Sequence, residues 1–242
     1  MEDDEGRSPE LLHEPPWNYR GRDIGRVLAL SDGVFAFAMT LLVIGLVVPA
    51  GDTGSAVTRY LTGQTFLNTL FTYVITFFVI AIWWRAHHRM FNYIEYYDSA
   101  LIRWNSAFLI FIAILPFTTE VLNASGTDPI GVVFFSVVQI ATSVALGGLW
   151  VYASGRGRLI RRIPGEWVTY IRNQGFFSAA IFALSIPVAF LNVSYAEFVW
   201  LAMFAVGYLQ RRKSPRPGHG GAGPSKGPQV PDHLNGQPRT SD

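Results

Sequence analysis

The stretch Arg26-Val-Leu-Ala-Leu-Ser-Asp-Gly33 runs straight into Val34-Phe-Ala-Phe-Ala-Met-Thr-Leu-Leu-Val-Ile-Gly-Leu46. Such a run is typical of a membrane-crossing helix, because about 20 apolar residues cover the roughly 30 Å of hydrocarbon in a bilayer. A helix that began at Gly33 would barely span, so we expect a start near Ile24 or Arg26. Asp32 then lies inside the helix, where a charge is costly unless it is paired. The alternative is that Ser31 or Asp32 is only an N-cap.

Five more apolar runs follow the first one, which lies near Val27–Pro49. They lie near Phe66–Trp84, Leu101–Leu122, Ile130–Tyr152, Phe176–Asn192 and Tyr195–Leu209. Half of the 242 residues are hydrophobic and only 15% are charged, a balance that favours lipid as the solvent. We therefore predict an all-α membrane protein with six transmembrane helices. The last two runs are short, so a single hairpin that does not cross twice is an alternative.

The basic residues are distributed unevenly between alternate connections. Of the 19 Lys and Arg residues, all but Arg59 fall in the two terminal segments and in the second and fourth connections. Cytoplasmic flanks are enriched in these residues, so both termini are predicted to be cytoplasmic. We expect a cytoplasmic arm over 1–22, a transmembrane domain over 23–210, and a disordered tail over 211–242, which is rich in Gly, Pro and Ser.

Composition also narrows the function classes. The chain has no cysteine, which excludes disulfides and thiolate metal sites. Neighbouring His87 and His88 project in different directions on a helix and have no carboxylate at ligand spacing, so we expect no metal and no cofactor. A net charge of +2 argues against a nucleic-acid partner. No nucleophile motif accompanies Asp32, which ranks an intramembrane enzyme low. The basic loop around Arg156–Arg162 fits anionic membrane lipid as a partner.

Two segments together resemble a known family. Arg26-x-x-x-Leu-Ser-Asp-Gly33 and Trp84-x-x-His-His-Arg-x-Phe91 look like the motifs of the transmembrane protein 175 (TMEM175) family of potassium channels. This chain has Leu30 where the family usually has Phe, and it carries one copy of the motif. The resemblance implies a homotetramer of six-helix subunits in a prokaryotic plasma membrane, with the first helix of each subunit lining a central pore for potassium ions.

The resemblance also implies which residues carry the function. The family has its pore constriction five positions after the motif Asp, which here is Phe37, and Leu41 and Ile44 would form further apolar layers. Thr40 is the polar residue expected in the pore. The remaining motif residues would form a packing network: Arg26, Ser31, Asp32, Gly33, Trp84, His87 and His88.

The spacing of the proposed pore residues can be judged separately from the resemblance. Phe37, Leu41, Ile44 and Val48 lie at i, i+4, i+7 and i+11, which is one helical stripe. Because every face of this helix is apolar, the stripe could equally meet lipid or a neighbouring helix. The chain lacks a Thr-Val-Gly-Tyr-Gly filter, so selectivity would have to come from the constriction and its polar neighbours.

A different class of function is also compatible with these residues. Asp32 together with His87 or His88 could serve a proton-conducting or proton-coupled transporter, because histidine changes charge near neutral pH. A non-conducting scaffold is a further alternative, favoured by nothing in the motifs.

Overall fold

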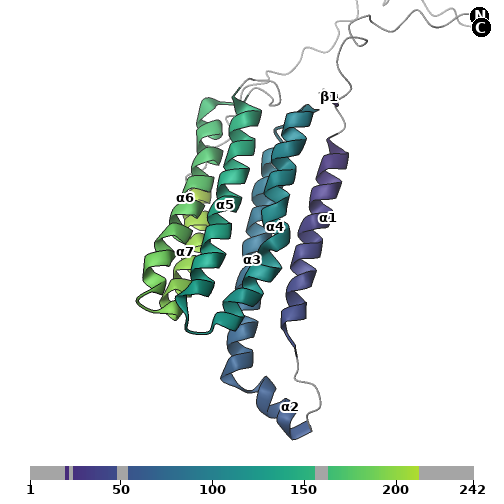
Figure 1. Cartoon of the computed structure of the whole chain (residues 1–242). Helices are drawn as coiled ribbons and strands as arrows, with labels where there is room; N and C mark the ends of the chain where they lie inside the picture. Colours follow the sequence, from purple (N-terminus) through teal and green to yellow (C-terminus); the bar gives the residue numbers. More distant parts are fainter. Residues whose placement is uncertain (1–19, 22–23, 48–53, 156–162, 213–242) are drawn as a thin grey trace, which may run out of the picture.

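The computed structural model describes residues 20–21, 24–47, 54–155 and 163–212. Within these residues the chain forms a bundle of long helices (Figure 1). They are α1 (Gly25–Leu41), which continues as the 3-10 turn η2 (Leu42–Gly45), α3 (Gln64–Phe91), α4 (Ser99–Ser125), α5 (Pro129–Ser154), α6 (Gly165–Ala189) and α7 (Val193–Arg212). The predicted tail lies outside the described residues except for the end of α7, and so does nearly all of the predicted arm.

Each long helix begins before the apolar run that predicted it. Helix α1 begins at Gly25 and therefore contains Asp32, as expected from the span length. Helix α3 continues to Phe91, so the whole Trp84–Phe91 motif is helical. Two small elements were not predicted: the short helix α2 (Gly54–Leu61), and an antiparallel pairing of β1 (Arg20–Gly21) with β2 (Tyr97–Asp98).

Four helical segments are long and apolar enough to cross a membrane, and each corresponds to one of the first four predicted runs. They are Gly25–Gly45, Gln64–Phe91, Ser99–Ser125 and Pro129–Ser154. Helices α6 and α7 have 25 and 20 residues and lie side by side with α5 in the bundle, but they do not meet the same hydropathy criterion over their described residues. The protein is thus an all-helical, multi-pass membrane protein.

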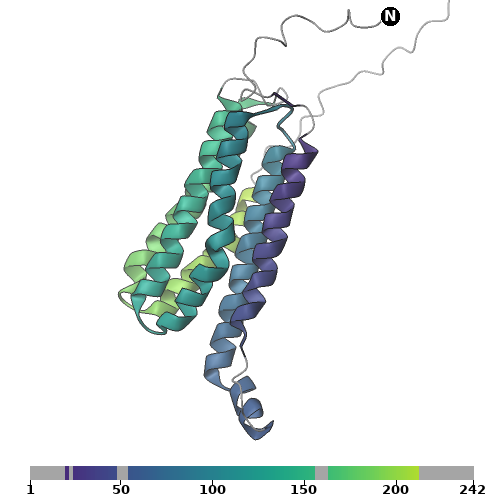
Figure 2. The same ribbon diagram turned by 45° about the vertical axis from the view of Figure 1, so that its right-hand side comes forward.

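The helix order gives the bundle two distinct ends. Helices α4, α5, α6 and α7 pack successively, and α1 packs against α4 and α3 (Figures 1 and 2). We name the end with Gly25, Phe91 and Ser99 the proximal end, and the end with Gly45 and α2 the distal end. Asp98 caps α4 at the proximal end by accepting a hydrogen bond from the Leu101 amide, and Asp128 caps α5 at the distal end in the same way through Ile130.

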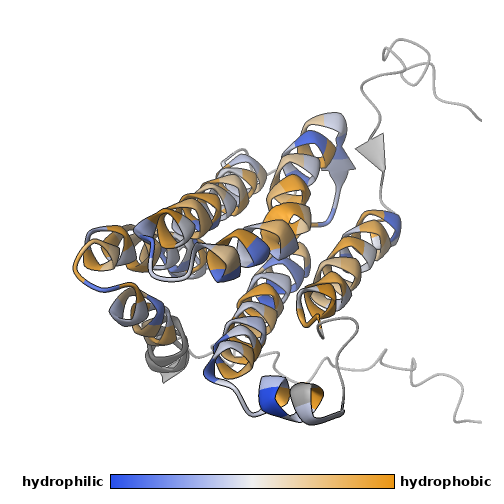
Figure 3. Ribbon diagram, turned by 60° about the horizontal axis from the view of Figure 1, so that its bottom comes forward, coloured by the Kyte–Doolittle hydropathy of each residue, from blue (hydrophilic) through white to orange (hydrophobic). Residues whose placement is uncertain are grey.

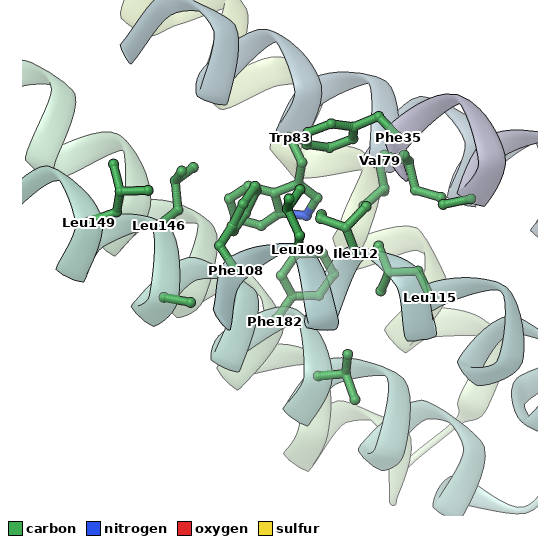
Figure 4. Close-up of a cluster of buried hydrophobic side chains, with 14 of the residues drawn as sticks. Phe35, Val79, Trp83, Phe108, Leu109, Ile112, Leu115, Leu146, Leu149 and Phe182 are labelled. Atoms are coloured by element: carbon green, nitrogen blue, oxygen red, sulfur yellow. The ribbon is translucent and has the colours of Figure 1, made fainter. Parts of the chain in front are cut away.

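The core of the bundle is aliphatic and aromatic. Figure 4 shows Phe108, Ile112 and Leu115 of α4 facing Val79 and Trp83 of α3. A second cluster joins the last three helices, where the ring of Trp200 lies 4.6 Å from that of Phe135 and 6.2 Å from that of Phe182. Every long helix exposes large apolar side chains. Figure 3 shows hydrophilic and apolar residues mixed in α2.

Glycines of α5 allow α4 to pack closely against it, and Gly148 is one of them. A Cβ added at Gly148 would lie 2.6 Å from the Trp104 ring, whereas one added at neighbouring Gly147 would meet nothing within 4 Å. We expect Gly148→Ala to lower the stability of the protein by about 1–3 kcal/mol, because the rigid indole must move. Thermal unfolding in detergent measures this change.

The matched control is Gly147→Ala, which should leave the unfolding temperature unchanged or raise it slightly, because alanine favours the helix. Equal effects of the two substitutions would contradict the packing described for Trp104.

Candidate functional site

Helix α1 has one buried face and one exposed apolar face. Ser31, Phe35, Ala38 and Leu42 point into the subunit and are at most 5% exposed. On the other side, Phe37 is 66% exposed and Ile44 is 65% exposed, seven residues apart. Seven residues are about two helical turns, so these side chains lie in one row. An apolar row that a single subunit leaves uncovered needs lipid or another protein copy against it.

The predicted stripe is close to this row but not identical with it. Phe37 and Ile44 lie at its centre, while Leu41 is half-buried at its edge. Thr40 and Val47 are more exposed than Leu41, and Val48 lies outside the described residues. The helix phase therefore turns Thr40, rather than Leu41, towards the open side between Phe37 and Ile44.

Thr40 holds its hydroxyl against its own helix. Its Oγ1 donates to the Phe37 carbonyl oxygen at 2.9 Å. A hydroxyl has one hydrogen and two lone pairs, so this bond leaves an acceptor oxygen on the exposed face. The exposed face of α1 can consequently offer the Thr40 Oγ1 to a cation, among side chains that are otherwise apolar.

A buried hydrogen-bonded chain ties α1 to α4 and α3 near the proximal end. Ser31 Oγ donates to the Val27 carbonyl oxygen at 2.8 Å and accepts from Asn105 Nδ2 at 3.0 Å. The Asn105 Oδ1 lies 2.8 Å from His87 Nε2, which must carry the hydrogen because Oδ1 is only an acceptor. Ser31, Asn105 and His87 are each no more than 2% exposed.

Aromatic rings surround the buried imidazole. The His87 ring stacks on Phe108 with centroids 5.5 Å apart and planes 6° apart, and it lies 4.3 Å from the Phe91 ring. Phe35 of α1 contacts both His87 and Phe108, at 5.7 Å and 5.9 Å. The side of α1 that carries Ser31 and Phe35 is thereby held against α3 and α4.

The other motif residues form a more exposed group. Asp32 Oδ1 accepts a 2.8 Å hydrogen bond from Trp84 Nε1, and the Trp84 ring lies 5.7 Å from the His88 ring. Gly33 is exposed and would have room for a side chain. Arg26 is exposed in the first turn of α1, and no hydrogen bond or ion pair joins it to other described residues. The structure thus brings together Ser31 with His87, and Asp32 with Trp84 and His88, but not Arg26 with either pair.

Other polar contacts also join helices of the bundle. Trp83 Nε1 donates to Gln139 Oε1 at 2.8 Å, which links α3 to α5. Arg89 of α3 hydrogen-bonds Gln174 of α6 at the proximal end. Asn105, which joins Ser31 to His87, belongs to neither motif. The available signal was an amide within an apolar run, where an interhelical hydrogen bond is the usual explanation.

Comparison with known proteins bears on what this arrangement does. The family described as the endosomal/lysosomal potassium channel TMEM175 matches residues 26–116, a range that contains both motifs and Asn105. A potassium channel of Streptomyces collinus is 31% identical over 173 residues, which cover 69% of this chain and 83% of that protein. The endosomal/lysosomal proton channel TMEM175 of Gallus gallus is 26% identical over 160 residues, covering 64% of this chain and 30% of that protein.

The fold has a counterpart among solved structures. The crystal structure of a lysosomal potassium-selective channel TMEM175 homolog from Chamaesiphon minutus superposes with a TM-score of 0.67. The match covers 81% of this chain and 100% of the solved chain at 23% sequence identity. At that identity the match supports the fold.

The buried hydrogen bonds of Asn105 should contribute more to the stability of the folded protein than the exposed hydrogen bond between Asp32 and Trp84. Asn105→Ala leaves His87 Nε2 without its buried partner, at a cost of about 1–3 kcal/mol, while Ser31 keeps its bond to Val27. Trp84→Phe removes a bond whose groups reach solvent, so its cost should be about 1 kcal/mol or less. Apparent melting temperatures of the two variants in detergent measure this difference, and an equal or larger drop for Trp84→Phe would contradict the assignment.

Proposed function

This chain belongs to the TMEM175 family, and from that premise we propose that it is a potassium-conducting channel whose pore is lined by the exposed face of α1. The single observation that carries the proposal is the continuous exposed row around Phe37 and Ile44, which one subunit leaves uncovered. This row runs along the axis of α1 and η2, as the lining of a conduction path requires. The named potassium channels among its relatives agree with this function.

A pore of this kind needs several copies of the chain, because one helix face cannot enclose a path. Four copies arranged around an axis would place four Phe37 rings at one level and four Ile44 side chains two turns further on. Leu41, at the edge of the exposed row, would contact the neighbouring copy as well as the pore. A homotetramer is therefore the assembly that we propose.

The constriction would act without a carbonyl filter. A ring of apolar side chains excludes water unless it is wide enough, so the size of Phe37 controls whether the path conducts. The Thr40 oxygen, one turn beyond Phe37, would replace part of the hydration shell of an ion that passes the ring. A preference for potassium over sodium would arise there, because potassium loses its hydration water at a lower cost.

The buried hydrogen-bonded residues would hold the pore-lining helix in place from inside the subunit. Ser31, Asn105 and His87 hold the rotation of α1, and the rotation decides which side chains face the axis. Asp32, Trp84 and His88 brace the same helix nearer the subunit surface, and Gly33 would allow close approach of another copy. Arg26, which has no bonded partner among the described residues, would face the proximal entrance.

We propose the membrane topology that the charge distribution predicts. All six long helices would cross the bilayer, with 23–210 as the channel domain, and both termini would lie on the cytoplasmic side, which makes the proximal end cytoplasmic. Helices α6 and α7 are long enough for this, since 20 residues of helix cover about 30 Å. The host membrane would be a prokaryotic cell membrane.

Proton conduction is the second candidate, and the name of the Gallus gallus relative favours it. Asp32, His87 and His88 are titratable groups near the proximal end of α1 that such a path could use. Asp32 bonds to Trp84 while His87 bonds to Asn105, so a proton would have to pass between two separate contacts. A pH gradient without a potassium gradient would drive flux through such a path, and Asp32→Asn would abolish it.

The constriction can be tested by truncating the exposed ring. Phe37→Ala should increase potassium flux into liposomes several-fold, because it widens the narrowest apolar ring. Phe176→Ala on α6 is the matched control, since Phe176 is 72% exposed but lies far along the chain from α1. It should leave the flux unchanged. If the unaltered, correctly assembled protein shows no potassium flux, the channel proposal is wrong.

The assembly can be tested by cross-linking, because the chain has no cysteine of its own. Ile44→Cys should form disulfide-linked dimers under mild oxidation in membranes, since copies would meet at the pore axis. Val144→Cys on α5 is a matched control, being 64% exposed against 65% for Ile44. Comparable cross-linking at both positions, measured on non-reducing gels, would rule out α1 as the axis of the assembly.

A further inference from the structure

A carboxylate lies against the distal end of α1. A Cβ built on Gly45 would be 2.9 Å from Oε2 of Glu120, which belongs to α4. The Glu120 side chain is exposed, and it has no hydrogen bond or ion pair with any other described residue. Gly45 is the last residue of η2, so the carboxylate lies beside the point where the proposed pore helix ends.

The two helices bring this carboxylate to the same place by packing along their whole length. Near the proximal end Asn105 of α4 hydrogen-bonds Ser31 of α1, and at the distal end Glu120 meets Gly45. Both helices run from the proximal to the distal end, so α1 and α4 are parallel and contact each other at both ends. The lack of a side chain at Gly45 is what lets the carboxylate approach.

The electrostatic environment of Glu120 is negative. The end of a helix presents free carbonyl oxygens and a partial negative charge, which opposes a nearby carboxylate and attracts a cation. Arg59 in α2 is the only basic residue in the three connections assigned to the distal side. The distal end also carries the carboxylates of Asp128 and Glu197, so its charge favours cations.

We propose that Glu120 is a conductance-determining residue that raises the local concentration of potassium ions at the distal mouth of the pore. The inference rests on the proposed function, because it needs α1 to line a cation path. Glu120 approaches α1 from α4, whereas Phe37 and Ile44 point out of the bundle, and a helix is about 10 Å across, so the carboxylate would lie within about one helix diameter of the path. It therefore acts through its electric field and does not bind the ion directly.

The distance determines how the effect depends on salt. The Debye length is about 10 Å at 0.1 M salt and about 3 Å at 1 M. A charge one helix diameter from the path acts at the lower concentration and is screened at the higher one. A direct ligand in the pore would instead affect conductance at both concentrations.

Single-channel conductance in planar bilayers tests this proposal. Glu120→Gln should lower the conductance about twofold at about 0.1 M KCl and leave it unchanged at about 1 M, where the charge is screened. Glu120→Asp keeps the charge and should keep the conductance at both concentrations. Glu197→Gln is the matched control: α7 packs against α6 and α5, so its charge lies further from α1, and the conductance should not change.

Three results would overturn the proposal. Equal conductance of Glu120→Gln and the unaltered protein at about 0.1 M would remove the electrostatic role. The same loss at both concentrations would mean that the substitution changes the structure of the pore instead. An equal loss in Glu197→Gln would assign the effect to the total charge of the distal end. If potassium current and its response to Phe37→Ala are intact, each of these results leaves the proposed channel standing.

Discussion

The need to satisfy buried polar groups within the bundle governs this structure. In hydrocarbon there is no water to pair with a serine hydroxyl, an amide or an imidazole, so these groups must bond to one another. Ser31, Asn105 and His87 do so across three helices, and the three are almost fully buried, although the Nδ1 atom of His87 has no hydrogen-bond partner among the described residues. Hydrogen bonds are directional, and the apolar contacts around them are not. The hydrogen bonds of these three residues therefore set the rotation of α1 about its axis.

That rotation separates the two faces of α1 and so connects packing to function. With Ser31 and Phe35 turned inwards, Phe37, Thr40 and Ile44 must point out of the subunit. The aromatic rings around His87 hold the arrangement at the proximal end, and the contact of Gly45 with Glu120 continues it to the distal end. The proposed pore face is therefore a consequence of contacts made on the opposite side of the same helix.

Several parts of the site were predictable from the sequence because they follow from local patterns. The length of the first apolar run favoured a place for Asp32 inside a helix over an N-cap, and the structure confirms it. Amides within the apolar runs are expected to bond between helices; Asn105 and Gln139 do so, whereas Asn192 accepts from the Tyr195 amide in its own turn. The rotation of the first helix was not derivable in the same way: Thr40 is exposed, whereas Leu41 is half-buried. A helix that is apolar on every face carries no periodic signal from which its rotation can be derived.

The sequence by itself determined that the chain crosses a membrane as a helical bundle, because about 20 apolar residues in a row have no other stable environment. It also determined that the two motifs lie at the same end of the bundle. The first motif begins the first span and the second motif ends the second span, and successive spans run in opposite directions. Only the tertiary structure decided which residues meet: that Asn105 joins Ser31 to His87, that Trp84 bonds Asp32, and that Glu120 lies against Gly45. Those contacts depend on how helices far apart in the chain rotate and slide against one another, which the spacing within a single helix does not specify.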